Sequence, residues 1–136
     1  MEIKFVNYEL ALKLKEKGFA EDCLAYYYPS GRLVYNWVGD DTIEKSGRCN
    51  YNNNKIPIIN APLLSQALDW LLDEKRCFVE VVLEPEGFCA NIYCNVQNTF
   101  VTSDDLVYCF LTKLGNSTSP IQAYESGVEY LLDEVL

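Results

Sequence analysis

The spacing of hydrophobic residues changes within one central stretch of the chain, residues 61–84. Its first half spaces apolar residues by three and four, as an amphipathic helix does, and these residues are Leu64, Ala67, Leu68 and Leu71. After residues 74–76 the period becomes two, with one side formed by Cys77, Val79, Val81 and Leu83 and the other by Phe78, Glu80, Val82 and Glu84. The pattern predicts a helix that runs directly into a strand, a suitable core for a small α+β domain.

A second helix is expected near the start of the chain. Asn7 suits the N-cap, because its side chain can accept a hydrogen bond from an N–H group of the first turn. Gly18 suits the left-handed position that ends a helix, where Phe19 folds back onto Leu14 as in a Schellman motif. Residues 3–6 are expected to add a short extended segment before this helix.

Residues 24–38 contain two runs of β-forming residues on either side of the turn sequence Pro-Ser-Gly-Arg. This composition predicts a β-hairpin. Its aromatic side chains have two interpretations: they cover a half-buried face of a sheet, or they form an exposed patch for a partner. Under the second interpretation, the residues that contact the partner are Tyr27, Tyr35 and Trp37.

The second half of the chain predicts an antiparallel meander. Residues 88–96 and 106–112 are strand-like runs, and short links join them to the strand at 77–84. A last helix is expected from Ser119, its cap, to the C-terminus. The predicted fold is a single α+β domain over residues 1–136, with the order α-β-β-α-β-β-β-α. It has one antiparallel sheet of about five strands and helices packed on one face.

The link between the hairpin and the central helix is long and polar. Residues 39–60 include several asparagines, which favour turns, and the adjacent pair Asp40 and Asp41. Connections of this length inside a compact domain are unusual, and they are often functional. One interpretation is therefore a small-ligand or enzyme site near this loop, built from acids and tyrosines.

The last helix carries an acidic ridge, defined by Glu125, Glu129 and Asp133. These residues follow one another at intervals of four, and like charges at this spacing destabilise a helix slightly. The ridge is either an ordinary solvated face or a surface that meets cations. Those cations would come from the lysine-rich first helix, from a second subunit in a homodimer, or from another protein.

The net charge is −9, and residues 77–136 contribute most of it, with nine acids against Lys113 alone. An acidic surface repels phosphate groups, so direct binding to nucleic acid is not expected. The charge either keeps the protein soluble, attracts a basic protein partner, or imitates nucleic acid in the groove of a DNA-binding protein.

The sequence predicts no catalytic residue, no metal ligand and no cofactor. The absence of histidine removes Ser-His and Cys-His pairs and histidine metal sites, and no phosphate-binding glycine motif occurs. The six cysteines have no CxxC spacing, and most lie in strand-like runs. We expect them to be free thiols that pack as small hydrophobic side chains.

The start of the chain has no long apolar segment of the kind that a secretory signal contains, and no run of 18 apolar residues occurs. These observations predict a cytoplasmic protein that does not bind membranes. That compartment is reducing, which agrees with free cysteines.

Three segments are similar to a known group of proteins: GFAEDCLAYYYPSGRLVY, INAPLLSQALDWLLDEK and AYESGVEYLLDEVL. Together they resemble small uncharacterised proteins encoded in phage and prophage genomes of gut bacteria. The matching positions are Cys23, Tyr26, Tyr27, Gly31, Ala61, Pro62, Gln66, Ala67, Trp70, Leu71, Tyr124 and Glu125. The resemblance implies a viral or mobile-element origin, and it transfers no activity and no functional residue.

Three functional hypotheses follow. The first is a non-enzymatic interaction or accessory protein that binds a host or phage protein through the acidic ridge and the aromatic strands. The second is an acidic mimic of nucleic acid that inhibits a DNA-binding protein. The third is a small ligand binder or enzyme near the loop at 39–60.

Overall fold

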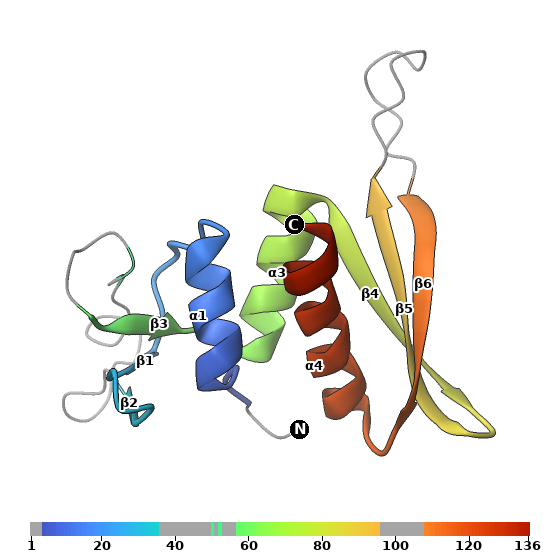
Figure 1. Cartoon of the computed structure of the whole chain (residues 1–136), viewed down its shortest axis with the longest axis horizontal. Helices are drawn as coiled ribbons and strands as arrows, with labels where there is room; N and C mark the ends of the chain where they lie inside the picture. The colour runs from blue at the N-terminus through green and yellow to red at the C-terminus, as the bar shows by residue number, and fades with distance from the viewer. Residues whose placement is uncertain (1–3, 36–49, 51, 53–56, 96–107) are drawn as a thin grey trace, which may run out of the picture. The chain divides into compact units, whose positions relative to one another are not determined.

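The computed structural model describes residues 4–35, 50, 52, 57–95 and 108–136 (Figure 1). Its elements are α1 (Tyr8–Glu16), β1 (Ala25–Tyr27), β2 (Leu33–Tyr35), β3 (Ile59–Ala61), α3 (Leu64–Lys75), β4 (Cys77–Glu84), β5 (Gly87–Asn95), β6 (Tyr108–Ser117), α4 (Pro120–Tyr130) and the π-helix η1 (Leu131–Val135). The chain forms two compact units, residues 1–67 with Leu136, and residues 68–135, so that the boundary falls within α3.

The α+β class and the antiparallel pairing are confirmed, but the arrangement of strands differs from the prediction. The described residues form two three-stranded sheets, β2-β1-β3 and β4-β5-β6, where one sheet of about five strands was expected. The difference comes from β3, which lies at the end of the region predicted as a loop. β3 pairs with β1, so the hairpin strands and β3 form one small sheet. The three strands of the meander form the second sheet.

In the first unit, the predicted ends of α1 are confirmed. Leu10 N donates to Asn7 Oδ1 at 2.8 Å, and Gly18 has φ +98°. Phe19 N donates to Leu14 O at 2.9 Å, and Gly18 N donates to Lys15 O at 3.1 Å, which together make a Schellman motif. Phe19 and Leu14 are both buried, so the end of the helix is also fixed by hydrophobic contact.

The first sheet is centred on β1. Ala25 pairs with Tyr35 on one side and with Ala61 on the other. The turn between β1 and β2 lies where it was predicted, with Gly31 at φ +87°. The extended segment before α1 is also present, because Phe5 forms an antiparallel bridge with Leu63. The N-terminal segment is therefore tied to the residues that precede α3.

Asparagines of the predicted loop bind backbone carbonyl groups. Asn52 Nδ2 donates to Phe19 O and Asn50 Nδ2 donates to Ala20 O, both at 2.7 Å. Asn60, fully buried, donates from Nδ2 to Glu21 O at 2.9 Å. These hydrogen bonds satisfy the backbone carbonyl groups of residues 19–21, which follow α1. The described asparagines therefore have a structural role in the first unit.

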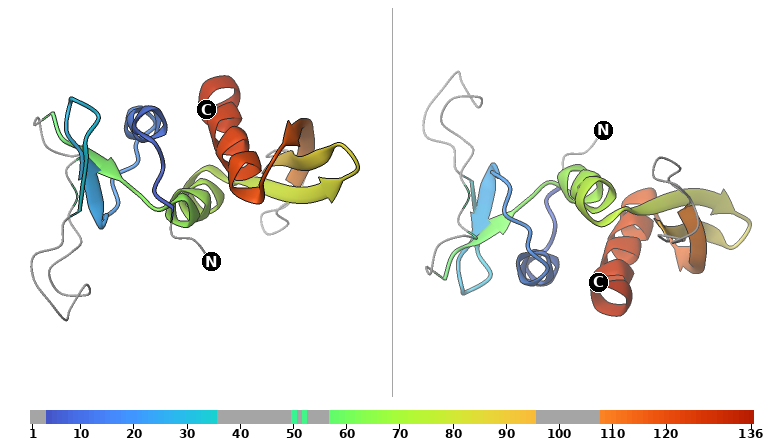
Figure 2. Two further views of the ribbon diagram at one scale, coloured as in Figure 1. Left: turned by 90° about the horizontal axis from the view of Figure 1, so that it is seen from below. Right: turned by 90° about the horizontal axis from the view of Figure 1, so that it is seen from above.

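The second unit contains a sheet with one regular pair of strands and one irregular pair. β4 and β5 stay in register from Cys77↔Cys94 to Glu84↔Gly87. β5 and β6 pair with two register shifts, one between Phe88 and Ala90 and one between Ile92 and Tyr93. β6 reaches Ser117, five residues beyond the predicted end of that strand. Two further views show α4 along one face of this sheet (Figure 2).

α4 approaches the sheet closely because residue 127 is glycine. A Cβ atom at Gly127 would lie 2.6 Å from Val79 Cγ1 and 3.2 Å from Ile92 Cδ1. Ser119 caps the helix as predicted, accepting from Gln122 N at 3.1 Å. Val128, Leu131 and Leu132 are buried, and together with Val79 and Ile92 they belong to the core of the second unit.

Candidate partner-binding surface

The face of the β4-β5-β6 sheet opposite α4 is the most distinctive surface of the second unit. Side chains alternate along a strand, and Val79 and Ile92 point towards α4. Their neighbours on β4 and β5 therefore point away from the helix. We call this surface the open face, and it comprises Phe78, Glu80, Val82, Glu84, Cys89, Asn91, Tyr93, Phe110 and Lys113.

An aromatic row, defined by Phe78, Tyr93 and Phe110, crosses all three strands of the open face. The ring centroids of Phe78 and Tyr93 are 6.2 Å apart, and those of Tyr93 and Phe110 are 5.7 Å apart in an edge-on arrangement. Phe78 is 42 % exposed and Phe110 is 56 % exposed. Such pairs stabilise a sheet by about 0.5–1.5 kcal/mol each, yet exposed rings on adjacent strands also form a ready contact for another protein.

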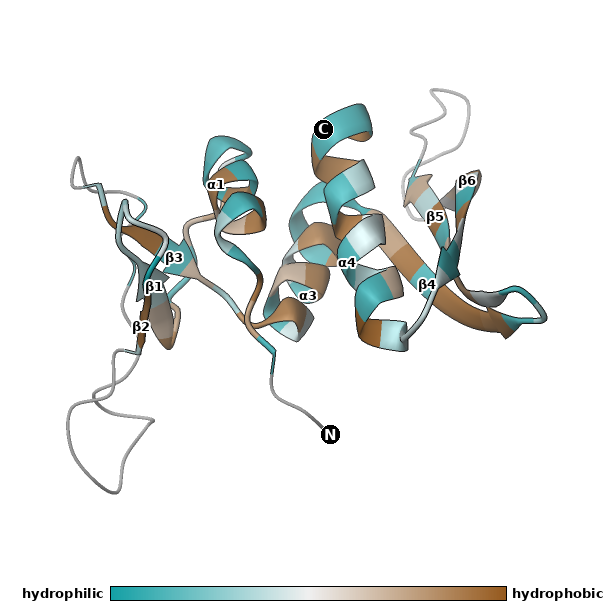
Figure 3. Ribbon diagram, turned by 60° about the horizontal axis from the view of Figure 1, so that its bottom comes forward, coloured by the Kyte–Doolittle hydropathy of each residue, from teal (hydrophilic) through white to brown (hydrophobic). Residues whose placement is uncertain are grey.

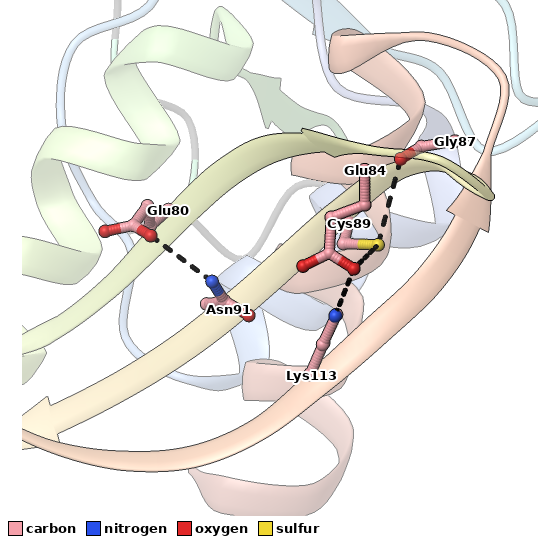
Figure 4. Close-up of polar contacts among 6 residues, drawn as sticks. All are labelled: Glu80, Glu84, Gly87, Cys89, Asn91 and Lys113. Carbon is pink, nitrogen blue, oxygen red and sulfur yellow. Dashed lines mark hydrogen bonds and ion pairs between the residues drawn. The ribbon is translucent and has the colours of Figure 1, made fainter.

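Beside the aromatic row, polar side chains bind one another across the strands (Figure 4). Asn91 Nδ2 donates to Glu80 Oε1 at 3.2 Å, and Lys113 pairs with Glu84. The hydrogen bond from Lys113 to Glu84 raises the pKa of the lysine, which stays charged at neutral pH. Cys89 Sγ also lies 3.7 Å from Glu84 Oε2. The carboxylates are thus engaged as acceptors, which orients them and leaves the open face polar at this end.

A hollow of about 280 Å³ lies against β4. It is formed by Leu68, Asp69 and Leu72 of α3, by Phe78, Val79, Glu80 and Val81 of β4, and by Tyr124 of α4. We call it the edge hollow. Its lining is mainly apolar, with Asp69, Glu80 and Tyr124 as the polar residues. Phe78 belongs both to the edge hollow and to the aromatic row, so the two features form one continuous surface.

The predicted partner-binding residues fall in different places. Tyr27 is only 7 % exposed, and its hydroxyl donates to Val6 O at 2.7 Å, so this ring belongs to the core of the first unit. Tyr35 is 57 % exposed, with its ring centroid 5.4 Å from that of Phe5. Trp37 lies outside the described residues. Of these two tyrosines, Tyr35 is exposed and Tyr27 is buried.

The acidic ridge lies on two kinds of helix. Glu125 is half-buried and Glu129 is exposed, and both belong to α4. Asp133 is exposed and belongs to η1, where hydrogen bonds span five residues and widen the turn. The regular spacing of four residues is therefore lost at Asp133, and the ridge is not one straight face of an α-helix.

Two of the predicted free thiols are neighbours in the core of the second unit. The Sγ atoms of Cys77 and Cys94 are 2.7 Å apart, and both side chains are buried. Burial, followed by the hydrogen bond with Cys94, raises the pKa of Cys77 to about 12. Cys89 is also free and buried, Cys109 is free and half-buried, and Cys23 is buried. A protonated, enclosed thiol is a poor nucleophile, so Cys77 acts in packing.

The described part of the chain contains neither a metal-binding cluster nor a candidate membrane span. Within those residues, no group of three or more cysteine, aspartate or glutamate side chains is arranged to hold a metal ion. No helix there is long and apolar enough to cross a membrane. The exposed features of the second unit are an aromatic row, polar side chains beside it, and a mainly apolar hollow.

No family model matches this chain, and no match was found among the curated proteins or among the solved structures. The candidate surface is therefore identified from its geometry alone. The sequence contained a signal for it: Phe78 alternates with Glu80 and Glu84, on the side of the strand that faces away from the core. The pattern could not show that Tyr93 and Phe110 would lie beside Phe78, because that depends on the register of three strands.

Proposed function

We propose that this protein is a non-enzymatic interaction protein, and that it binds a partner protein through the open face of the second unit. The observation that supports this most is the aromatic row, two of whose three rings are largely exposed. Exposed aromatic side chains that neighbour one another are typical anchors of protein interfaces. The resemblance to phage and prophage proteins supports an accessory role in a bacterial cytoplasm, with a host or phage protein as the partner.

The test compares two exposed aromatic residues that lie in different units. Phe110 is 56 % exposed and Tyr35 is 57 % exposed. Purified protein with Phe110→Ser or Tyr35→Ser is immobilised, and the proteins that it captures from bacterial lysate are identified by mass spectrometry. We expect Phe110→Ser to lose a specific partner that the parent and Tyr35→Ser both retain. Retention of every captured protein by a folded Phe110→Ser variant would contradict the open face as the binding surface.

A second candidate, imitation of nucleic acid, is favoured by the distribution of charge. Residues 68–135 hold twelve acids and three bases, whereas residues 1–67 hold eight of each. All of the net charge of −9 therefore belongs to the second unit. Imitation predicts that double-stranded DNA displaces the captured protein, and that capture weakens steeply between about 50 and 200 mM salt. Binding through the aromatic row does not predict displacement by double-stranded DNA.

The loop hypothesis receives less support. Residues 39–49, 51 and 53–56 lie outside the described residues, so most of the candidate region is not placed. Asn50, Asn52 and Asn60, which are described, bind backbone carbonyls of residues 19–21. These hydrogen bonds give the three asparagines a structural role in the first unit, and that role explains their presence without a ligand.

A further inference from the structure

The outer edge of β4 presents backbone groups to an incoming strand. Asn95 N donates to Arg76 O at 2.9 Å, so this pair is hydrogen-bonded across the two strands. Hydrogen-bonded pairs alternate along an antiparallel ladder, and the register stays regular to the turn. The even-numbered residues of β4 thus bind β5, and the N–H and C=O groups of Val79, Val81 and Leu83 point away from it. Since β4 is the first strand of its sheet, these groups lie at the edge.

The two edges of this sheet differ in how they discourage pairing. β6, at the other edge, has two register shifts against β5, and such irregularities disrupt the pattern that a new strand needs. β4 is eight residues long, with the sequence CFVEVVLE, and it contains no proline and no register shift. Figure 3 shows this strand as mostly hydrophobic. A long, regular, apolar edge is the kind that pairs with another chain.

The edge hollow supplies space beside the same backbone groups. Val79 and Val81 line it together with Leu68 and Leu72 of α3. Its volume of about 280 Å³ is slightly below the range of roughly 300–1,000 Å³ for small-molecule pockets. It therefore suits the side chains of a segment that lies along β4 better than a separate small ligand. Peptide-binding domains that add a strand to a sheet edge use the same combination of an edge and a side-chain pocket.

Charge decides between a second copy of this chain and a different protein. Asp69 and Glu80 flank the apolar lining of the edge hollow, and the second unit as a whole carries −9. A second copy would bring another unit with the same negative charge to this edge. A basic segment would instead be attracted by it, because complementary charges steer association.

We propose that the outer edge of β4 binds an extended, basic segment of the partner protein as an added antiparallel or parallel strand. Alternate aliphatic side chains of this segment enter the edge hollow, and lysine or arginine side chains between them lie near Asp69 and Glu80. This proposal rests on the proposed function, and it adds the binding mode and the chemistry of the segment that is bound.

The experiment uses a short synthetic peptide of alternating lysine and valine, with three comparison peptides. One has the same composition in scrambled order, one has glutamate in place of lysine, and one has N-methyl groups on alternate backbone amides. Affinity is measured by fluorescence anisotropy with the whole protein, and the bound residues are located by amide chemical shifts. We expect the alternating peptide to bind at least about tenfold more tightly than each comparison peptide, and to shift the amides of residues 79–83 most.

Two variants of the protein test the edge directly. Val81→Pro removes an N–H that points away from β5, and proline is tolerated at such an edge position. Asp69→Lys reverses a charge of the edge hollow, and its control is Glu134→Lys, an equal change at an exposed residue outside the hollow. Each of Val81→Pro and Asp69→Lys is expected to weaken peptide binding at least about tenfold, with Glu134→Lys close to the parent.

The outcomes separate this inference from the proposed function. Shifts confined to Tyr93 and Phe110, or a protein partner captured through Phe110 with no binding of any peptide, would overturn strand addition and leave the open face as a binding surface. Self-association of the protein that Val81→Pro abolishes would assign the edge to a second copy and also overturn it. Loss of both peptide binding and Phe110-dependent capture would remove both proposals.

Discussion

At the scale of single residues, the buried thiol of Cys77 makes the stability of the protein depend on pH. Its pKa is raised to about 12 by burial and by the hydrogen bond with Cys94, whereas the ordinary value is 9.0. Above pH 9.0 the unfolded chain loses this proton while the folded chain keeps it. The unfolded state then binds fewer protons, so the free energy of unfolding falls as the pH rises.

This dependence is measured by comparing the parent with Cys77→Val. Chemical unfolding under reducing conditions is followed from pH 9 to 12, the interval between the two pKa values. The parent is expected to lose up to about 1.4 kcal/mol per pH unit more than the variant. The raised pKa values of Tyr27 and Lys113 act in the same direction, but these residues are present in both proteins. Parallel curves for parent and variant would contradict the raised pKa of Cys77.

At the scale of elements, the contact between α4 and the sheet depends on the missing side chain of Gly127. Alanine is the better helix former by about 1 kcal/mol, so local propensity alone favours Gly127→Ala. The new Cβ would lie 2.6 Å from Val79 Cγ1, a distance that forces the helix or the valine to move. Overpacking of this kind costs about 1–3 kcal/mol.

We therefore expect Gly127→Ala to lower the free energy of unfolding by about 1 kcal/mol or more, measured by chemical denaturation. Val79→Ala removes the two nearest atoms that the new Cβ would meet, so the double variant should be more stable than the sum of the two single effects predicts. Ser126→Ala, on the same helix, is the control and should change stability by less than about 0.5 kcal/mol. A stabilised Gly127→Ala protein would show that α4 does not approach Val79 this closely.

The sequence predicted where the helices and strands lie much better than it predicted which of them pair with one another. The caps Asn7 and Ser119 and the glycine end of α1 are local signals, since each depends on a few adjacent residues. β3 was missed because a strand of three residues has too few positions to show a period. The aromatic row was not predicted as a unit, because the pairing of Tyr93 with both Phe78 and Phe110 is a property of register.

At the scale of the whole molecule, the net charge is unevenly distributed between two regions of nearly equal length. The first 67 residues are electrically balanced, and residues 68–135 carry the entire −9. The acidic ridge contributes three of these charges, and acids elsewhere contribute the others. The charge of the second unit thus acts as a field over its whole surface, which influences the rate of encounter with a basic partner.

Charge reversal tests whether the acidic ridge contacts the partner directly or only contributes to the overall negative charge. One variant changes Glu125, Glu129 and Asp133 to lysine, and its control changes the exposed acids Glu9, Glu16 and Glu74 to lysine. Both variants have the same net charge, and their folding is checked by thermal unfolding. We expect both to weaken partner capture to a similar degree, because neither touches the open face. A complete loss confined to the ridge variant would move the binding site to α4 and η1.

The sequence by itself determined most of the helices and strands, the caps of α1 and α4, the free buried thiols and the charge of the second half of the chain. These properties arise from local conformational preference, from periodic burial and from composition, all of which are written in consecutive residues. Only the tertiary structure decided that the strands form two sheets, that three aromatic rings adjoin on one face, and that β4 lies at an edge beside a hollow. These features depend on strand order and register, which bring together residues such as Phe78 and Phe110 that are far apart in the chain.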